Sequence, residues 1–181
     1  MKREHLEHLL RASAAILITR GSRKVPQELV VIGSQSILGQ YPEAPAALLR
    51  SMEADIYPLN EPALADEIDG AIGELSPFHD TYGYYVQGVG PNTATLPARW
   101  LNRVVRVQND NTGQGIGLCL EVHDLAISKY VAGRDKDASF TLELAQHAMI
   151  KRSVLETRLA ATMLPEVVRE IVRQRITSSF R

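Results

Sequence analysis

The spacing of hydrophobic residues predicts that the chain starts as a helix followed by two short strands. Apolar positions in residues 3–19 recur at helical intervals and predict an amphipathic helix. Residues 28–32 form a mostly apolar run, typical of a strand buried on both faces. In residues 52–57 polar and apolar side chains alternate, as in a strand with one polar face. Between the strands, residues 35–38 are expected to form the first turn of a helix.

The rest of the pattern predicts further strands and then only helices. A helix is expected over 61–74 with Pro62 at its first position, followed by strands over 81–89, 101–108 and 115–120. Asp124 is expected to cap a helix that includes Lys129, and three more helices are expected over 138–149, 151–161 and 165–177. We therefore expect an α/β (α+β) fold, with a mixed β-sheet flanked by helices over residues 1–123. Residues 124–181 would form a C-terminal helical region packed on it.

The turn after the first strand has the composition of a phosphate-binding loop. Gly33 and Ser34 interrupt the apolar run just before the expected helix. Ser34 is a suitable N-cap, because its hydroxyl can accept a hydrogen bond from an amide of the first turn. Exposed amides and the positive end of the helix dipole would then face one point, which favours binding of a phosphate group.

The second strand adds a pair of acidic side chains. Alternation places Glu53, Asp55 and Tyr57 on one face of the strand. Two carboxylates this close repel each other unless a cation lies between them. Mg²⁺, or Mn²⁺ in its place, is held in proteins by one or two carboxylates together with substrate phosphates. The two strands together indicate metal-assisted chemistry on a nucleotide.

These elements resemble the nucleotidyltransferase superfamily of the DNA polymerase beta type. The shared features are Gly33-Ser34 between strand and helix, and Glu53-Ala54-Asp55 on the next strand. Residues 123–137 also resemble the K-x-x-A-x-x-R-x-K-D helix of a bacterial subgroup that includes the AbiEii-like toxins. The resemblance implies a nucleoside triphosphate substrate and an acceptor such as tRNA or protein. It also implies a possible toxin–antitoxin pair, in which the partner is the cognate antitoxin or toxin.

The resemblance and the helical pattern together indicate further candidate site residues within 123–137. On one continuous helix Lys129, Gly133 and Lys136 would share a face. Lys129 is the expected contact to the triphosphate, with Arg134 or Lys136 as a second cation. The alternative is an ordinary charged helix face, with local pairing among Arg134, Asp135, Lys136 and Asp137. Asp137 is expected to act as the third carboxylate of the catalytic set.

Two departures from the family pattern keep a non-catalytic alternative open. The first carboxylate is Glu53 instead of the commoner aspartate, and no carboxylate is evident in 81–89 or 101–108, where superfamily members carry a third. A module of the same fold that binds a nucleotide or a partner protein, such as an antitoxin or regulatory component, needs the glycine-serine turn but not all three acids. A dinucleotide-binding domain fits less well, because the G-x-G-x-x-G spacing is lacking.

Composition excludes several other classes of protein. The 181 residues carry a formal net charge of −1, so a general polyanion-binding surface is not expected. The single cysteine, Cys119, excludes an internal disulfide and a cysteine-based zinc site. No apolar run approaches the roughly 20 residues of a membrane span, and the N-terminal residues lack the layout of a signal peptide. We expect a cytoplasmic protein without membrane contact.

Aromatic and histidine side chains admit two interpretations each. Trp100 and the tyrosines at 82, 84 and 85 either stack on a nucleobase or pack in the core. His5 and His8, three residues apart, are either a metal pair or two surface histidines.

Overall fold

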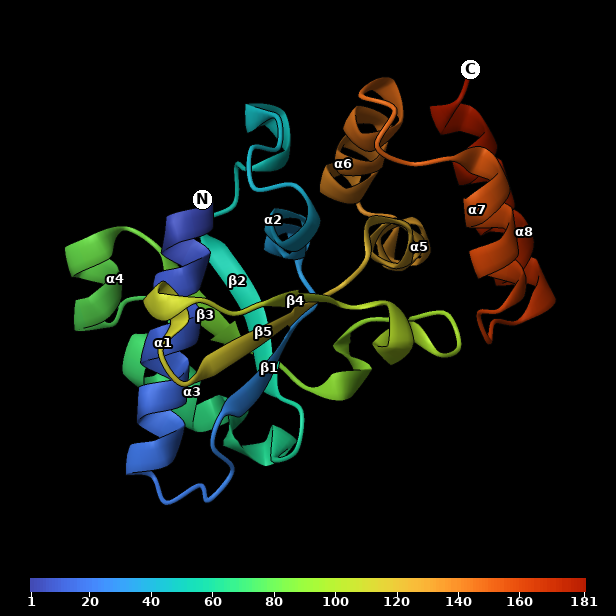
Figure 1. The fold of residues 1–181 in the computed structure, drawn as a ribbon. Helices are drawn as coiled ribbons and strands as arrows, with labels where there is room; N and C mark the ends of the chain where they lie inside the picture. Colours follow the sequence, from blue (N-terminus) through green and yellow to red (C-terminus); the bar gives the residue numbers. More distant parts are fainter. The chain divides into compact units, whose positions relative to one another are not determined.

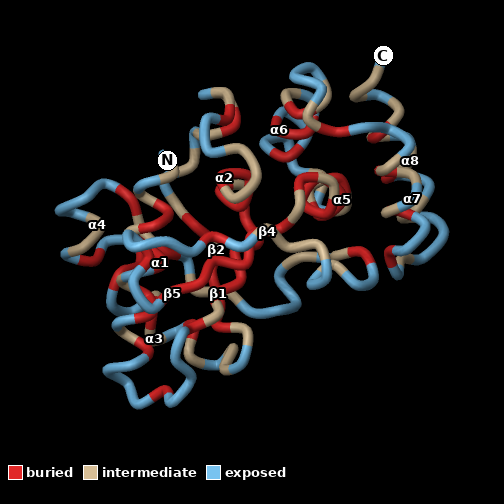
Figure 2. The backbone as a smooth tube through the Cα atoms, viewed as in Figure 1, coloured by how far each residue is buried: buried red, intermediate tan, exposed pale blue.

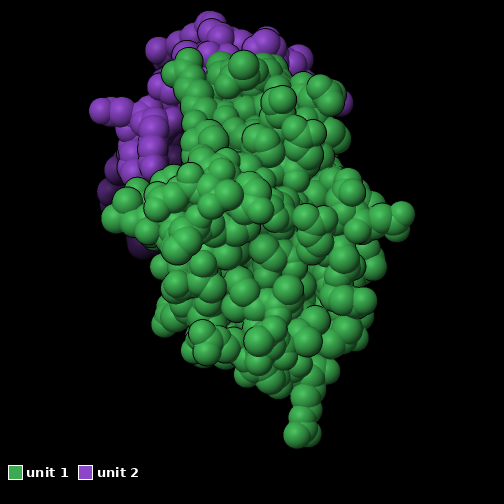
Figure 3. All heavy atoms as spheres, turned by 90° about the vertical axis from the view of Figure 1, so that its left-hand side faces the viewer, with its two compact units in different colours: residues 1–93, 104–120 green, residues 94–103, 121–181 purple.

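The computed structural model describes residues 1–181, which form two compact units (Figure 3). Unit 1 comprises residues 1–93 and 104–120, and unit 2 comprises residues 94–103 and 121–181. The predicted α/β class is confirmed, because the chain contains a five-stranded mixed sheet and eight α-helices (Figure 1). None of these helices is both long enough and apolar enough to cross a membrane.

The sheet of unit 1 has the strand order β3-β2-β1-β5-β4. Its strands are β1 (Gln27–Val31), β2 (Glu53–Pro58), β3 (Tyr85–Gly88), β4 (Val105–Val107) and β5 (Gly115–Cys119). β1 runs antiparallel to β2 and parallel to β5, β2 runs parallel to β3, and β4 runs antiparallel to β5. The two most buried strands, β1 and β5, lie next to each other inside the sheet, and Figure 2 shows the buried residues concentrated there.

Helices pack on one face of this sheet. They include α1 (Arg3–Thr19), α2 (Ile37–Gln40) and α3 (Ala65–Ile72). A Cβ added to Gly117 of β5 would lie 2.7 Å from Leu10 of α1, and one added to Gly39 of α2 would lie 2.5 Å from Cys119. Gly117 and Cys119 point the same way because they are two residues apart on one strand. The Leu10 side chain of α1 and the backbone of α2 therefore approach the same face closely.

The acidic side chains of β2 point to the opposite face. Cys119 pairs with Val31, and Val31 pairs with Ile56, so these three side chains lie on the helix-covered face. Asp55 precedes Ile56 and must point the other way, together with Glu53. The predicted alternation of β2 is confirmed by burial over residues 53–56, since Ala54 and Ile56 are fully buried whereas the two acids are half-buried. Tyr57, predicted on the acidic face, is buried as well.

The strand predicted over 81–89 is wrong in its first half. Residues Pro77–Tyr82 form helix α4, and only Tyr85–Gly88 form a strand. Ser76 caps α4 by accepting a hydrogen bond from the amide of His79, and Gly83 ends it with a left-handed φ of 74°. These capping signals outweigh the β-propensity of Thr81 and Tyr82. Similarly, the strand predicted over 101–108 is reduced to β4, because residues 100–103 form a 3-10 turn.

Unit 2 is helical, with α5 (Val122–Ala132), α6 (Asp135–Gln146), α7 (Arg152–Ala160) and α8 (Glu166–Ser179). The predicted cap at Asp124 is wrong: Glu121 caps α5 through the amide of His123, at 3.1 Å. Asp124 is fully buried and forms ion pairs with Arg103 at 2.8 Å and Arg158 at 3.0 Å. A buried carboxylate needs such partners. These ion pairs hold the 94–103 segment against α5 and α7.

Candidate active site on strand β2

The backbone of Gly33 lies directly against the carboxylate of Asp55. The amide of Ile32 donates to the carbonyl oxygen of Asp55 at 3.1 Å, which extends the pairing of β1 with β2 by one residue. A Cβ added to Gly33 would lie 1.7 Å from Oδ2 and 2.7 Å from Cγ of Asp55. The φ of Gly33, −79°, is open to any residue, so space and not conformation requires glycine here. Two predicted site residues are thus brought into contact.

The turn that follows is tighter than predicted. Residues Ser34–Ser36 form a 3-10 turn, and α2 after it has only four residues. Gly33 occupies the capping position of the turn, so the prediction of Ser34 as N-cap is wrong. The hydroxyl of Ser36 instead donates to the carbonyl of Leu120 at 3.2 Å and fixes the turn to the end of β5. A helix this short contributes little dipole, so any phosphate contact here depends on individual amides and the half-buried Ser34.

Glu53 is held by a tyrosine on the neighbouring strand. The parallel pairing of β2 with β3 places Tyr85 opposite Glu53 and Gln87 opposite Asp55. The Tyr85 hydroxyl donates to Oε2 of Glu53 at 3.3 Å. Burial, with the Glu53 carboxylate as the next cause, raises the pKa of Tyr85 to about 12. Tyr85 therefore stays protonated at neutral pH and keeps donating to Glu53.

The third carboxylate expected of this type of site is lacking on β3, whose residues are Tyr85, Val86, Gln87 and Gly88. Nowhere in the chain do three or more histidine, cysteine or acidic side chains gather as a metal-binding group. Glu53 and Asp55 nevertheless fit Mg²⁺, which accepts one or two carboxylates and takes its other ligands from phosphates and water. They lie two residues apart on one face of β2 and both are half-buried.

The second block of predicted residues lies in unit 2 and is not one continuous helix. α5 ends at Ala132, Gly133 adopts a left-handed φ of 63°, and Arg134 is the N-cap of α6. The predicted common face of Lys129, Gly133 and Lys136 is therefore wrong. Lys136 is exposed in the first turn of α6. The glycine in this sequence is a helix C-cap, which the helical spacing alone did not reveal.

Asp137 joins the two helices. It is 2% exposed, and its Oδ1 lies 3.3 Å from Nζ of Lys129. Its Oδ2 accepts a hydrogen bond from the backbone amide of Arg134 at 3.3 Å and lies 3.8 Å from Nε of the same residue. Both oxygens thus have partners within unit 2. The alternative of local pairing is confirmed for Arg134 with Asp137, and Lys129 joins the same carboxylate. The roles of these residues in nucleotide binding and catalysis stay predictions.

Tyr82 and Tyr84 pack against each other, with ring centroids 6.0 Å apart, whereas Trp100 lies half-buried in a 3-10 turn. Tyr84 is buried, its ring stacks on His5 with centroids 4.4 Å apart, and its hydroxyl lies 2.8 Å from Nδ1 of His8. Burial is the main cause that lowers the pKa of both histidines.

The sequence suggested only base stacking or core packing for Tyr85, and not its hydrogen bond to Glu53. The place of Tyr85 opposite Glu53 follows only from the register of β3, which sequence alone does not give.

Comparison with known families adds one finding. A family model described as "Nucleotidyltransferase of unknown function (DUF6036)" matches residues 7–178. The curated proteins and the solved structures gave no match.

Proposed function

The chain belongs to this family of nucleotidyltransferases, and from that premise we propose a specific reaction. The protein transfers a nucleotidyl group from a nucleoside triphosphate to an acceptor hydroxyl on tRNA or protein. Glu53 and Asp55 hold Mg²⁺, or Mn²⁺, at the edge of the site.

The observation that carries this proposal is the contact between Gly33 and Asp55. The contact joins the turn after β1 to an acid of β2, so that a phosphate at the turn and a cation at the acid would be neighbours. The cation would neutralise phosphate charge and orient the reacting oxygens. The two half-buried carboxylates supply the donor set that this ion requires.

The remaining residues act by binding and positioning. Ser34 and the amides of its turn bind phosphate oxygens. Tyr85 keeps the Glu53 carboxylate in place through its hydrogen bond. Lys129 contributes positive charge toward the triphosphate, with Arg134 or Lys136 in support, and Asp137 orients the ammonium of Lys129.

We further propose a role related to that of the AbiEii-like toxins, with a cognate antitoxin or toxin as partner. Its support is the Lys129 to Asp137 motif, which resembles the helix motif of those toxins. The ion pair between these two residues gives the motif a fixed geometry in unit 2.

One observation favours a second function. Tyr85 and Gln87 occupy the β3 positions opposite Glu53 and Asp55, and neither can serve as a third carboxylate. A protein that binds a nucleotide or a partner without transferring anything would need no third acid.

A transfer assay separates the two functions. Nucleoside triphosphates labelled at the α-phosphate are incubated with tRNA or with a protein extract, with Mg²⁺ or Mn²⁺. Incorporated label that disappears in Asp55→Asn, and persists in the control Asp66→Asn on the exposed side of α3, supports transfer. Triphosphate binding without incorporation on either acceptor supports the non-catalytic module.

A further inference from the structure

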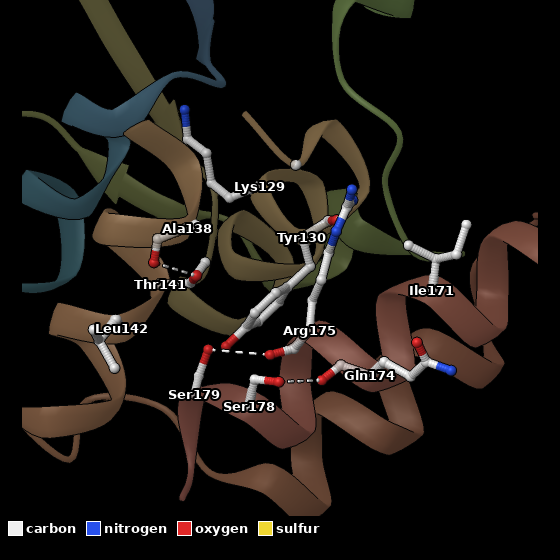
Figure 4. A pocket seen from close by; sticks show the side chains of 11 residues that line it. Lys129, Tyr130, Ala138, Thr141, Leu142, Ile171, Gln174, Arg175, Ser178 and Ser179 are labelled. Carbon is white, nitrogen blue, oxygen red and sulfur yellow. Dashed lines mark hydrogen bonds between the residues drawn. The ribbon is translucent and has the colours of Figure 1, made fainter. Parts of the chain in front are cut away.

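The pocket of about 380 Å³ between α5, α6 and α8 in unit 2 has its polar groups paired within the protein (Figure 4). Nη1 of Arg175 donates to the carbonyl of Tyr130 at 2.7 Å. The ammonium of Lys129 has Asp137 as its counterion. Figure 4 shows the Tyr130 hydroxyl directed toward Ser179, whose hydroxyl oxygen can accept its proton. This pocket therefore contains no group that requires a ligand.

In unit 1, the hydrogen bond from Tyr85 to Glu53 depends on the angle of the tyrosine ring. Burial and the negative charges of three nearby acids raise the pKa of Tyr85 to about 12. The acids are Glu53, Glu74 and Asp55. Oε2 of Glu53 accepts the hydrogen bond at 3.3 Å, which leaves Oε1 for a cation. The ring must therefore be held at an angle that directs its hydroxyl to Glu53 among the three acids.

His79 packs directly on the ring of Tyr85. The centroids of the two rings are 4.5 Å apart, with 49° between the planes, and both side chains are half-buried. His79 lies on α4, and the amide of Gly83 donates to its carbonyl at 2.8 Å. The left-handed φ of Gly83, 74°, then turns the chain toward β3. The end of α4 thus brings the two rings together.

The imidazole of His79 is itself fixed in orientation. Its Nδ1 accepts a hydrogen bond from the amide of Leu75 at 3.1 Å, so the proton of the neutral ring lies on Nε2. Leu75 is 83% exposed and has a φ of 62°, in the left-handed region that a leucine rarely adopts. This conformation costs free energy, and it occurs at the residue whose amide meets the ring. The chain before α4 therefore sets the angle of the imidazole.

We propose that His79 is a positioning residue of the metal site, which holds the Tyr85 ring so that its hydroxyl donates to Glu53. The inference rests on the proposed function, in which Glu53 binds Mg²⁺. His79 acts through Tyr85 alone, because a ring packed against another ring limits its rotation. A tyrosine ring that was free to turn would direct its hydroxyl to Glu53 for only part of the time, and the carboxylate would be less ordered.

The first test needs neither metal nor nucleotide, so it stands even if the proposed function fails. In the full chain labelled with fluorotyrosine, the fluorine resonance of Tyr85 is identified by its loss in Tyr85→Phe and is followed to alkaline pH. Burial is the main cause that raises the pKa of Tyr85, so His79→Ala, which uncovers the ring, should shift this titration to lower pH. Asp80→Ala, at an exposed neighbour on α4, should not. The same titration in His79→Ala and the parent chain overturns the proposal.

A second variant separates the ring contact from the loop. His79→Asn keeps an oxygen that can accept from the amide of Leu75 but has no ring. Tyr85 should therefore titrate at the same lower pH as in His79→Ala. If Tyr85 titrates in His79→Asn as it does in the parent chain, the loop holds the tyrosine and the proposal is wrong.

The second test measures whether His79 acts on Mg²⁺ binding through Tyr85. The apparent Mg²⁺ affinity at fixed triphosphate is compared among the parent, His79→Ala, Tyr85→Phe and the double variant. His79→Ala should lower the affinity about three- to tenfold, as loss of one hydrogen bond does, and should cause no further loss in Tyr85→Phe. Additive losses indicate a merely structural role and overturn the proposal. If the parent chain binds no Mg²⁺, the proposed function fails, and the titration of Tyr85 still decides whether His79 positions it.

Discussion

Asp55 and Gly33 are in contact across two strands, so that a single methyl group on Gly33 would come within 1.7 Å of Oδ2. Contact at this distance is impossible without moving the acid or the turn. The two residues are 22 positions apart in the sequence (55 − 33), yet they form one structural unit. The glycine-serine turn and the acidic strand therefore belong to the same candidate site.

Gly33→Ala tests this contact. The added methyl group displaces the Asp55 carboxylate, so Mg²⁺-dependent triphosphate binding should fall at least about tenfold, with a stability loss of about 1–3 kcal/mol. Calorimetric titration and urea unfolding measure the two effects. The control is Gly70→Ala in α3, where an added Cβ meets nothing within 4 Å. The free energy of unfolding of this control variant should rise by up to about 1 kcal/mol, because alanine is the better helix former. Equal binding by Gly33→Ala and the parent would contradict the account.

Tyr85→Phe tests the support of Glu53. Loss of the hydroxyl removes the hydrogen bond to Oε2, and we expect the apparent Mg²⁺ affinity to fall by about three- to tenfold with the fold intact. Titration of Mg²⁺ at fixed triphosphate measures this. The effect should be confined to the metal dependence, and an unchanged Mg²⁺ affinity would show that Tyr85 does not support Glu53.

Tyr85 also predicts a pH dependence of stability. Its pKa is about 12 in the folded chain, above the ordinary value of 10.0. The stabilisation from the protonated form is complete below pH 10, where both states are protonated, and is lost as the pH rises from 10 toward 12. Melting temperatures across this window should fall less steeply in Tyr85→Phe than in the parent. Parallel curves for the two proteins would contradict the shifted pKa.

Gln35 tests how a buried side-chain amide without hydrogen-bond partners affects stability. It follows Ser34, is fully buried, and neither its amide nitrogen nor its oxygen has a partner. Gln35→Met should raise the free energy of unfolding by about 1 kcal/mol, because an uncompensated polar group is removed. The matched control is Gln27→Met, at a buried glutamine that donates to Oγ of Ser22 at 2.8 Å. Gln27→Met should lower the free energy of unfolding, because it removes a satisfied hydrogen bond. If urea unfolding showed both variants to be stabilised, or both to be destabilised, the lack of partners at Gln35 would not matter for stability.

The ion pair of Lys129 and Asp137 predicts strong coupling. Asp137→Ala leaves a mostly buried ammonium without its counterion and removes the acceptor of the Arg134 amide, so a loss of about 3–5 kcal/mol is expected. In a chain that already carries Lys129→Met, Asp137→Ala should lower the free energy of unfolding by less. A double-mutant cycle on urea unfolding measures the coupling, and additive effects would show that the pair contributes nothing.

The sequence predicted the parts of the fold that depend on local periodicity. The helix near the N-terminus, the alternation of β2 and the helices of the C-terminal half follow from residue spacing. It failed where capping competes with propensity: Ser76 and Gly83 make a helix of residues that include Thr81 and Tyr82. Gly133 likewise separates Lys129 from Lys136, although the spacing of the cations fits one helix.

The candidate site was predictable only in outline. Gly33, Glu53 and Asp55 stand out by residue type, but the contact of Gly33 with Asp55 depends on the antiparallel register of β1 and β2. The link from Glu53 to Tyr85 depends on the parallel register of β2 and β3. Long-range register leaves no trace in a single sequence, because each strand shows only its own alternation.

The most direct measurement is calorimetric titration of each nucleoside triphosphate into the protein with and without Mg²⁺, for the parent chain and Asp55→Asn. The account predicts binding of at least one triphosphate that requires Mg²⁺ and is lost in Asp55→Asn, with Asp66→Asn unaffected. Triphosphate binding that ignores both Mg²⁺ and the substitution at Asp55, or no binding at all, would contradict the assignment of this site.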